Sequence, residues 1–87
     1  SYVEDFTVVP PVFLHETAVI ENAVVGPFAN VEAGAKISHS VIRNSLIGKQ
    51  AAVENTVLDG SIVGDRAGVR GAGNAPLVED DEQITLP

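Results

Sequence analysis

The sequence predicts an all-β fold, a parallel β-helix built from triangular coils, on the strength of three observations. Aliphatic residues recur at steps of six or five along most of the chain. The residue two places before each of them is small from Ile20 onward. At the five-residue steps, the corner residue is of a type that tolerates a left-handed backbone. An uninterrupted repeat of this kind is the signature of a solenoid whose coils bury a continuous core.

The two repeating positions define the inside of each coil. The aliphatic series is Leu14, Ile20, Val25, Val31, Ile37, Ile42, Ile47, Val53, Leu58, Val63 and Val69. The small residues are Ala18, Ala23, Ala29, Ala35, Ser40, Ser45, Ala51, Thr56, Ser61 and Ala67. Strand alternation points both positions inward, and the small one lies near the corner, where a triangular interior narrows. Three steps make one coil, so we expect about three and a half to four coils, stacked about 4.8 Å apart.

The short steps make a prediction about the corners. A corner that loses one residue should force the remaining one into a left-handed conformation, which Gly adopts freely and which Asn, Asp and His adopt more often than other residues. The short corners carry Asn22, His39, Asn44, Asn55 and Gly60. The six-residue corners carry Glu16-Thr17, Pro27-Phe28, Ala33-Gly34, Lys49-Gln50 and Asp65-Arg66, and there we expect no such restriction.

The chain has 87 residues, enough for one domain. We expect an N-terminal lead-in and cap over residues 1–13, the β-helix over 14–73, and an acidic C-terminal cap and tail over 74–87. Both ends of a column expose strand edges that need covering, and Pro10, Pro11 and Pro76 suit that task because proline cannot extend a ladder. The run Glu79 to Glu82 reads as a solvated acidic tail. There is no methionine, even at position 1, so we expect Ser1 to lie inside a longer protein.

Composition excludes several classes of function. The net charge is -7 and the five Lys and Arg residues are scattered, so the basic stripe of a nucleic-acid-binding protein is missing. No apolar run approaches the roughly 20 residues that cross a bilayer, so no membrane partner is expected. The absence of cysteine excludes disulfides, zinc fingers and thiol nucleophiles. A cytoplasmic setting fits this composition.

The outward positions predict an interface. The residue before each inward aliphatic points away from the core, and on two adjacent sides these residues are apolar, whereas the remaining side is far more polar. A contiguous apolar patch usually marks an interaction surface. The alternative is that β-branched residues merely suit flat strands. The candidate interface residues are Phe13, Val24, Phe28, Val41, Leu46, Val57 and Ile62.

The two histidines are the remaining candidates for chemistry. His15 follows inward Leu14 and so faces outward, while His39 lies at a short corner. An acyltransferase of similar architecture would use a histidine as general base, but we favour a structural corner position for His39 and a plain surface position for His15 over that role. A metal site shared between subunits needs three histidines, and two on different sides do not supply them. We therefore predict no catalytic, cofactor-binding or metal-binding residue in this chain.

Three stretches resemble a known family. They are PPVFLHETAVIENAVVGP from Pro10 to Pro27, the corners NSLIG and GSIVG, and the ending VGDRAGVRGAGNAPLVEDDEQITL. Together they resemble the C-terminal hexapeptide-repeat domain of long-form glucose-1-phosphate thymidylyltransferases, within the sugar-phosphate nucleotidyltransferase family. The resemblance covers Pro10 to Leu86, and similar corners occur in other sugar-nucleotide pyrophosphorylases, including the ADP-glucose type. It implies a left-handed β-helix, although parallel crossovers elsewhere are mostly right-handed.

The resemblance also implies that catalysis and assembly belong to different domains. Catalysis in that family belongs to an N-terminal Rossmann-like domain with a Gly-rich nucleotide loop and carboxylates that bind magnesium. The Gly-dense stretch from Gly64 to Gly73 does not follow a strand and open a helix, as such a loop requires. We therefore expect a non-catalytic assembly and regulatory domain, without a cofactor of its own.

Its expected partners are another copy of the chain, its own N-terminal nucleotidyltransferase domain, or both. The parent reaction implied is nucleotidyl transfer from a nucleoside triphosphate, here dTTP, to glucose 1-phosphate with release of pyrophosphate, and magnesium is implied for the missing catalytic domain. Two alternatives stay open. One is a hexapeptide acyltransferase that uses acetyl coenzyme A with His15 or His39 as base, and the other is a free-standing scaffold protein.

Overall fold

Three parallel sheets make up the fold of the computed structural model, which describes residues 2–4, 7–71 and 77–85. Sheet A contains β1 (Tyr2–Glu4), β4 (Val19–Glu21), β7 (Lys36–Ser38), β10 (Ala52–Glu54), β13 (Gly68–Arg70) and β15 (Gln83–Thr85). Sheet B contains β2 (Thr7–Val8), β5 (Val24–Val25), β8 (Val41–Arg43) and β11 (Val57–Asp59). Sheet C contains β3 (Val12–Leu14), β6 (Ala29–Val31), β9 (Leu46–Ile47), β12 (Ile62–Val63) and β14 (Leu77–Val78). In this part of the chain no helix is long and apolar enough to cross a membrane.

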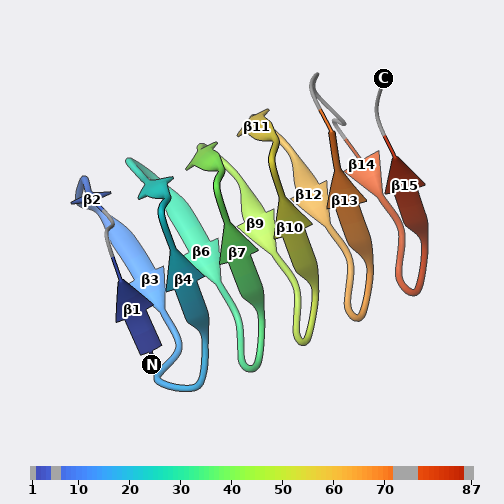
Figure 1. Ribbon diagram of the computed structural model, residues 1–87, viewed down its shortest axis with the longest axis horizontal. Coiled ribbons are helices and arrows are strands. Elements are labelled where there is room, and N and C mark those ends of the chain that lie inside the picture. The colour runs from blue at the N-terminus through green and yellow to red at the C-terminus, as the bar shows by residue number, and fades with distance from the viewer. Residues whose placement is uncertain (1, 5–6, 72–76, 86–87) are drawn as a thin grey trace.

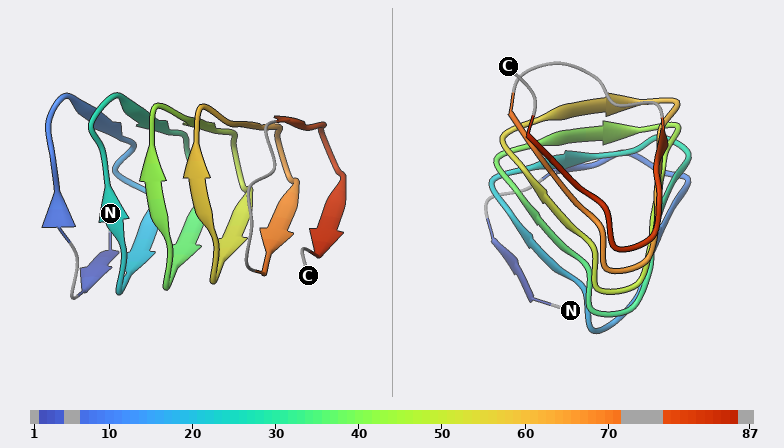
Figure 2. Two further views of the ribbon diagram at one scale, coloured as in Figure 1. Left: turned by 90° about the horizontal axis from the view of Figure 1, so that it is seen from above. Right: turned by 90° about the vertical axis from the view of Figure 1, so that its right-hand side faces the viewer.

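The chain winds as a three-sided column, with β1 at one end and β15 at the other (Figure 1). From β1 to β13 successive strands visit sheets A, B and C in turn, and β14 and β15 then return to sheets C and A. Within each sheet, neighbouring strands come from neighbouring coils. In the right panel of Figure 2 the C-terminal coils face the viewer, and the green and gold strands of sheet B cross the top from left to right. The chain therefore turns clockwise as it approaches the viewer, which is a left-handed winding. The predicted parallel β-helix is confirmed.

The column is longer than the repeat predicted. Sheet A has six strands, so five coils separate β1 from β15, rather than three and a half to four. Val8 in sheet B and Val78 in sheet C each pair in register with the inward valine of the neighbouring coil. The predicted series stopped at Val69 because nine residues separate it from Val78, more than a six-residue step allows. The segments 1–13 and 74–87, expected as caps, thus also contribute strands to these sheets.

The core consists of three ladders of aliphatic side chains, as the repeat predicted. Sheet A supplies Ile20, Ile37, Val53 and Val69; sheet B supplies Val25, Ile42 and Leu58; sheet C supplies Val31, Ile47, Val63 and Val78. All of them are at most 2% exposed. Leu14 and Ile84, near the ends of the column, are only partly buried and pack against this core. Because each coil covers the next, burial is complete in the middle and weaker at the ends.

Buried hydroxyl groups link neighbouring coils at the short corners. Ser45 Oγ donates to the Arg43 carbonyl oxygen at 2.7 Å and accepts from the Ser61 backbone N–H at 3.1 Å. Ser40 makes the same two kinds of bond, at 2.7 and 3.2 Å. A buried hydroxyl without partners would be destabilising. At Ser40 and Ser45 the hydroxyl is therefore satisfied on both sides, whereas Ala23 takes the same small position at the short corner of Asn22.

Left-handed backbone occurs at both kinds of corner. The prediction for the short corners is confirmed, because Asn22, His39, Asn44, Asn55 and Gly60 all have φ between 49° and 73°. The prediction of no restriction at the six-residue corners is wrong at four of the five, since among the second residues of these corners Thr17 alone does not have positive φ. There the second corner residue has positive φ in Phe28 (59°), Gly34 (70°), Gln50 (57°) and Arg66 (59°), and Asp81 (61°) repeats this one coil later.

A hydrogen bond to the preceding coil explains why these corner residues have positive φ. The Gln50 N–H donates to the Ala33 carbonyl oxygen at 2.8 Å, and the Arg66 N–H donates to the Lys49 carbonyl oxygen at 2.7 Å. The short corners do the same, as in the 3.0 Å bond from the His39 N–H to the Glu21 carbonyl oxygen. A left-handed residue turns its N–H along the column toward this acceptor. The bond holds even residues for which left-handed backbone is normally unfavourable by about 1 kcal/mol or more.

Candidate functional site

Valines form a column on the outer surface of sheet B. Val24, Val41 and Val57 lie opposite one another in adjacent strands, on the face that points away from the core. Val24 is 38% exposed and Val57 is 46% exposed, whereas Val41 is half-buried. Apolar side chains in register along one face of a sheet form a continuous strip. The three sheet B residues predicted for the interface therefore lie together.

Sheet C carries a second and longer apolar column. Phe13, Leu46 and Ile62 share this outward position, and the register adds Leu77 at the C-terminal end. Their exposed fractions run from 40% for Leu46 to 59% for Leu77. The sequence interpretation missed Leu77 because the repeat was not followed past Val69. The signal for it was the pair Leu77-Val78, an outward aliphatic followed by an inward one.

One polar residue interrupts the sheet C column. Asn30 lies between Phe13 and Leu46 in the register. Its Oδ1 is buried and has no hydrogen-bond partner. An unpaired buried amide oxygen is unfavourable. The interruption divides the column into an N-terminal part at Phe13 and a longer C-terminal part from Leu46 to Leu77.

The two apolar faces meet at the corner that joins sheet B to sheet C. Phe28 occupies this corner in left-handed conformation and is 65% exposed, and Val9 lies at the same corner one coil earlier and is 40% exposed. Arg43 Nε donates to Asp59 Oδ2 at 2.9 Å beside them, and Asn44 Nδ2 donates to Asp59 Oδ1 at 3.0 Å. These two hydrogen bonds, first from Asn44 and then from Arg43, lower the pKa of Asp59. The charges at this corner are thus paired.

Sheet A presents a different surface. Its outward side chains outside β1 are Val19, Glu21, Lys36, Ser38, Ala52, Glu54, Arg70, Gln83 and Thr85, with Gly68 in the same rows. Most are polar, charged or small. The three sides of the column are therefore chemically unequal, as the sequence predicted, with two apolar faces and one polar face.

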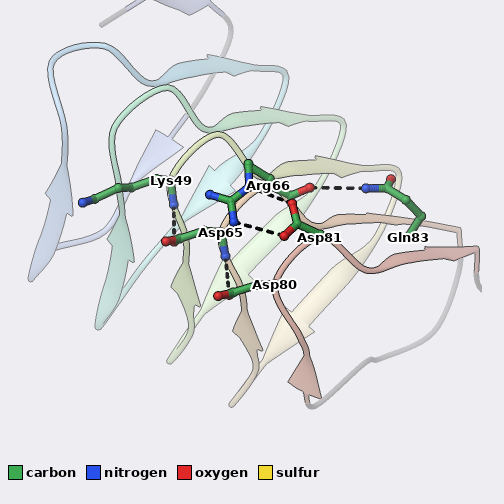
Figure 3. A network of polar contacts seen from close by, with 6 residues as sticks. All are labelled: Lys49, Asp65, Arg66, Asp80, Asp81 and Gln83. Atoms are coloured by element: carbon green, nitrogen blue, oxygen red, sulfur yellow. Dashed lines mark hydrogen bonds and ion pairs between the residues drawn. The ribbon is translucent and has the colours of Figure 1, made fainter.

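A ladder of carboxylates and backbone N–H groups occupies the corner from sheet C to sheet A (Figure 3). Asp65 Oδ1 accepts from the Lys49 N–H at 2.9 Å, and Asp80 Oδ1 accepts from the Asp65 N–H at 2.8 Å. Arg66 pairs with Asp81 through two hydrogen bonds, at 2.7 and 3.0 Å. This pairing lowers the pKa of Asp81 and raises that of Arg66. The run Glu79 to Glu82, predicted as a solvated tail, is exposed but turns the last corner of the column.

The structure does not bring the two histidines together. His15 lies on the path from sheet C to sheet A, where its Nδ1 contacts Thr17 Oγ1 at 2.9 Å and accepts from the Thr17 N–H at 3.1 Å. His39 lies at the corner from sheet A to sheet B. Within the described ranges, no three His, Asp or Glu side chains come together to hold a metal ion.

Comparison of the chain with models of protein families gives no match, and comparison with curated proteins gives none either.

Proposed function

We propose that this β-helix is a non-catalytic assembly domain, which packs against a partner through the apolar outer faces of sheets B and C. The observation that supports this proposal is the exposure of two apolar columns that flank one corner. Proteins rarely leave contiguous apolar surface exposed unless it is used for interaction. Short strands held by core ladders provide rigid, flat faces, so a partner can bind with little loss of backbone conformational entropy in this domain.

We further propose that the parent protein is a sugar-1-phosphate nucleotidyltransferase, and that this chain is its C-terminal domain. The support is the resemblance of three stretches between Pro10 and Leu86 to that family, together with the β-helix fold. The parent reaction would transfer a nucleotidyl group, from dTTP in the thymidylyltransferase case, to a sugar 1-phosphate and release pyrophosphate. Magnesium would be bound by the catalytic domain.

The first experiment reads the native coding sequence upstream of Ser1. A Rossmann-like domain with a Gly-rich nucleotide loop supports the parent assignment. A start codon directly before Ser1 ends it.

The second experiment tests assembly itself. Sedimentation equilibrium is measured on the purified chain, alone and mixed with the separately expressed segment encoded upstream. We expect association in one of these samples, and we expect Val57→Asp to weaken it at least about tenfold, because a charge would lie in the interface. Ala52→Asp, at an outward position of the polar sheet A, is the matched control and should leave association unchanged. A monomer in every sample would contradict the assembly role.

A further inference from the structure

A hollow adjoins the C-terminal part of the sheet C column. It has a volume of about 440 Å³ and is lined by Ile62, Gly64, Leu77, Val78, Glu79 and Asp80. Ile62 and Leu77 form one wall and are 53% and 59% exposed. At Gly64, atoms of Glu79 and Asp80 fill the space that a side chain would take. The hollow is therefore apolar on one side and acidic on the other.

The two carboxylates on the acidic side, Glu79 and Asp80, are not part of an ion pair. Two ion pairs occur among the described residues, Arg43 with Asp59 and Arg66 with Asp81, and neither includes Glu79 or Asp80. Asp80 Oδ1 accepts one hydrogen bond, from the Asp65 N–H. A carboxylate has further lone pairs available on both oxygens. A cation at the rim of the hollow would therefore find acceptors.

We propose that this hollow receives an arginine or lysine side chain of a protein partner whose docking surface combines apolar residues with a basic edge. This proposal rests on the assembly function above and names the chemistry of the partner. The methylene stem of such a side chain would lie on Ile62 and Leu77, while its cationic head would reach Glu79 and Asp80. Long basic side chains bury their stems on apolar surface in this way and keep the charged head at the rim. Arginine in particular is enriched among the residues that dominate interface energies.

Charge favours such a partner over a second copy of this chain. The net charge is -7. On the described outer faces of sheets B and C the one cationic side chain is Arg43, and it is already paired with Asp59. Among the described residues at the borders of these faces, Lys49 is the one Lys or Arg outside the two ion pairs, so a second copy would bring one such cation together with a net charge of -7. A partner with a basic edge supplies the cations and gains from electrostatic steering as well.

The available area also suits one docking partner. A standard interface buries about 800 Å² on each side. The chain exposes 4582 Å² in total, so such an interface would cover a little under a fifth of it. One side of a three-sided column provides an area of that order. The sheet C face alone can therefore accommodate the partner.

The test uses a probe of this chemistry, the blocked tripeptide acetyl-Leu-Arg-Leu-amide, with acetyl-Leu-Gln-Leu-amide as its uncharged match. Binding to the 87-residue chain is followed by amide chemical shifts in NMR. We expect the arginine peptide to shift the amides of Ile62, Gly64, Leu77 and Val78. The double variant Glu79→Gln with Asp80→Asn should weaken binding roughly five- to tenfold, as expected for two exposed ion pairs. In that variant the new amide oxygen can still accept from the Asp65 N–H, and a dispersed spectrum confirms that the fold is retained.

Three results of the peptide experiment would overturn the proposal. They are equal binding of both peptides, arginine-peptide shifts located away from these residues, and no shifts with the arginine peptide at about 10 mM, near the top of the accessible range for weak ligands. Dimerisation of the wild-type chain that is lost in Ile62→Asp would also overturn it, because a second copy would then be the occupant. That last result leaves the assembly function standing. The assembly function fails separately, if the sedimentation samples stay monomeric.

Discussion

Substitution of Gly64 by alanine should destabilise the protein through a steric clash and not through its backbone conformation. The φ of Gly64 is not positive, so alanine is compatible with its backbone conformation. A Cβ built at Gly64 would nevertheless lie 2.5 Å from the Asp80 backbone nitrogen and 2.8 Å from the Glu79 carbonyl carbon, and still closer to Asp80 Oδ1. These backbone atoms belong to the next coil and cannot move away without disturbing β14.

The expected loss follows from three contributions. Forcing an extra carbon into a packed site typically costs about 1–3 kcal/mol. Displacement of the Asp80 carboxylate also removes its hydrogen bond with the Asp65 N–H, a loss of about 1 kcal/mol. Replacing glycine returns roughly 0.4–1 kcal/mol, because the unfolded chain loses conformational freedom. The net destabilisation should lie between about 1 and 3.6 kcal/mol, centred on about 2–2.5 kcal/mol.

Thermal unfolding followed by far-UV circular dichroism measures this loss. For a domain of this size, 1 kcal/mol corresponds to about 4–8 °C in Tm, so Gly64→Ala should lower Tm by roughly 10–20 °C. Gly60→Ala is the control. Gly60 has a φ of 73°, but no atom lies within 4 Å of a Cβ built there, so only the left-handed backbone disfavours alanine, by about 1 kcal/mol. A Tm decrease for Gly64→Ala no larger than that for Gly60→Ala would refute the steric argument.

Three further outcomes are expected. Ile42→Asp should unfold the domain, since it buries an unpaired charge. The neighbouring Val41→Asp should keep the circular dichroism spectrum of the wild type, because Val41 points outward. Equal loss of structure in both variants would contradict the inward assignment of Ile42 and the outward assignment of Val41. Ser45→Ala should lower the free energy of unfolding in urea by about 1–3 kcal/mol, as it removes a buried hydroxyl that bonds both the Arg43 carbonyl oxygen and the Ser61 N–H; an unchanged midpoint would count against a contribution from these bonds. Because its bond with Arg66 lowers the pKa of Asp81, the contribution of this carboxylate to stability is present above the ordinary carboxyl pKa of about 3.9 and is lost as the pH falls through the lower folded value. Asp81→Asn should therefore flatten the acid limb of a plot of Tm against pH, and an unaltered limb would show that the pair does not contribute.

The inside of the column could be predicted from the sequence because it depends on local spacing. Each side of the coil holds one aliphatic side chain, and the narrowing toward the corner admits only a small one before it. Both requirements recur every five or six residues, within reach of a pattern read along the chain. The same spacing predicted the outward positions, and Phe13, Val24, Phe28, Leu46, Val57 and Ile62 are indeed exposed.

The corners and the ends depended on contacts that the local pattern does not contain. Positive φ at Gln50 or Arg66 is held by a hydrogen bond to a carbonyl group in the preceding coil, 17 residues earlier. Leu77 joins the sheet C column only through pairing of β14 with β12, across an irregular step. Val41 carries the same outward assignment as Val24 and Val57 but is half-buried.

The sequence by itself therefore determined the parallel β-helix, its core ladders and the apolar character of two of its faces. These follow from a period that each turn of the chain must satisfy separately. The tertiary structure decided the number of coils, the left-handed six-residue corners, and the hollow between Ile62, Leu77 and the carboxylates of the last corner. Each of these arises where one coil meets the next, so its causes lie about 15 to 17 residues apart in the chain and become neighbours only when the column is complete.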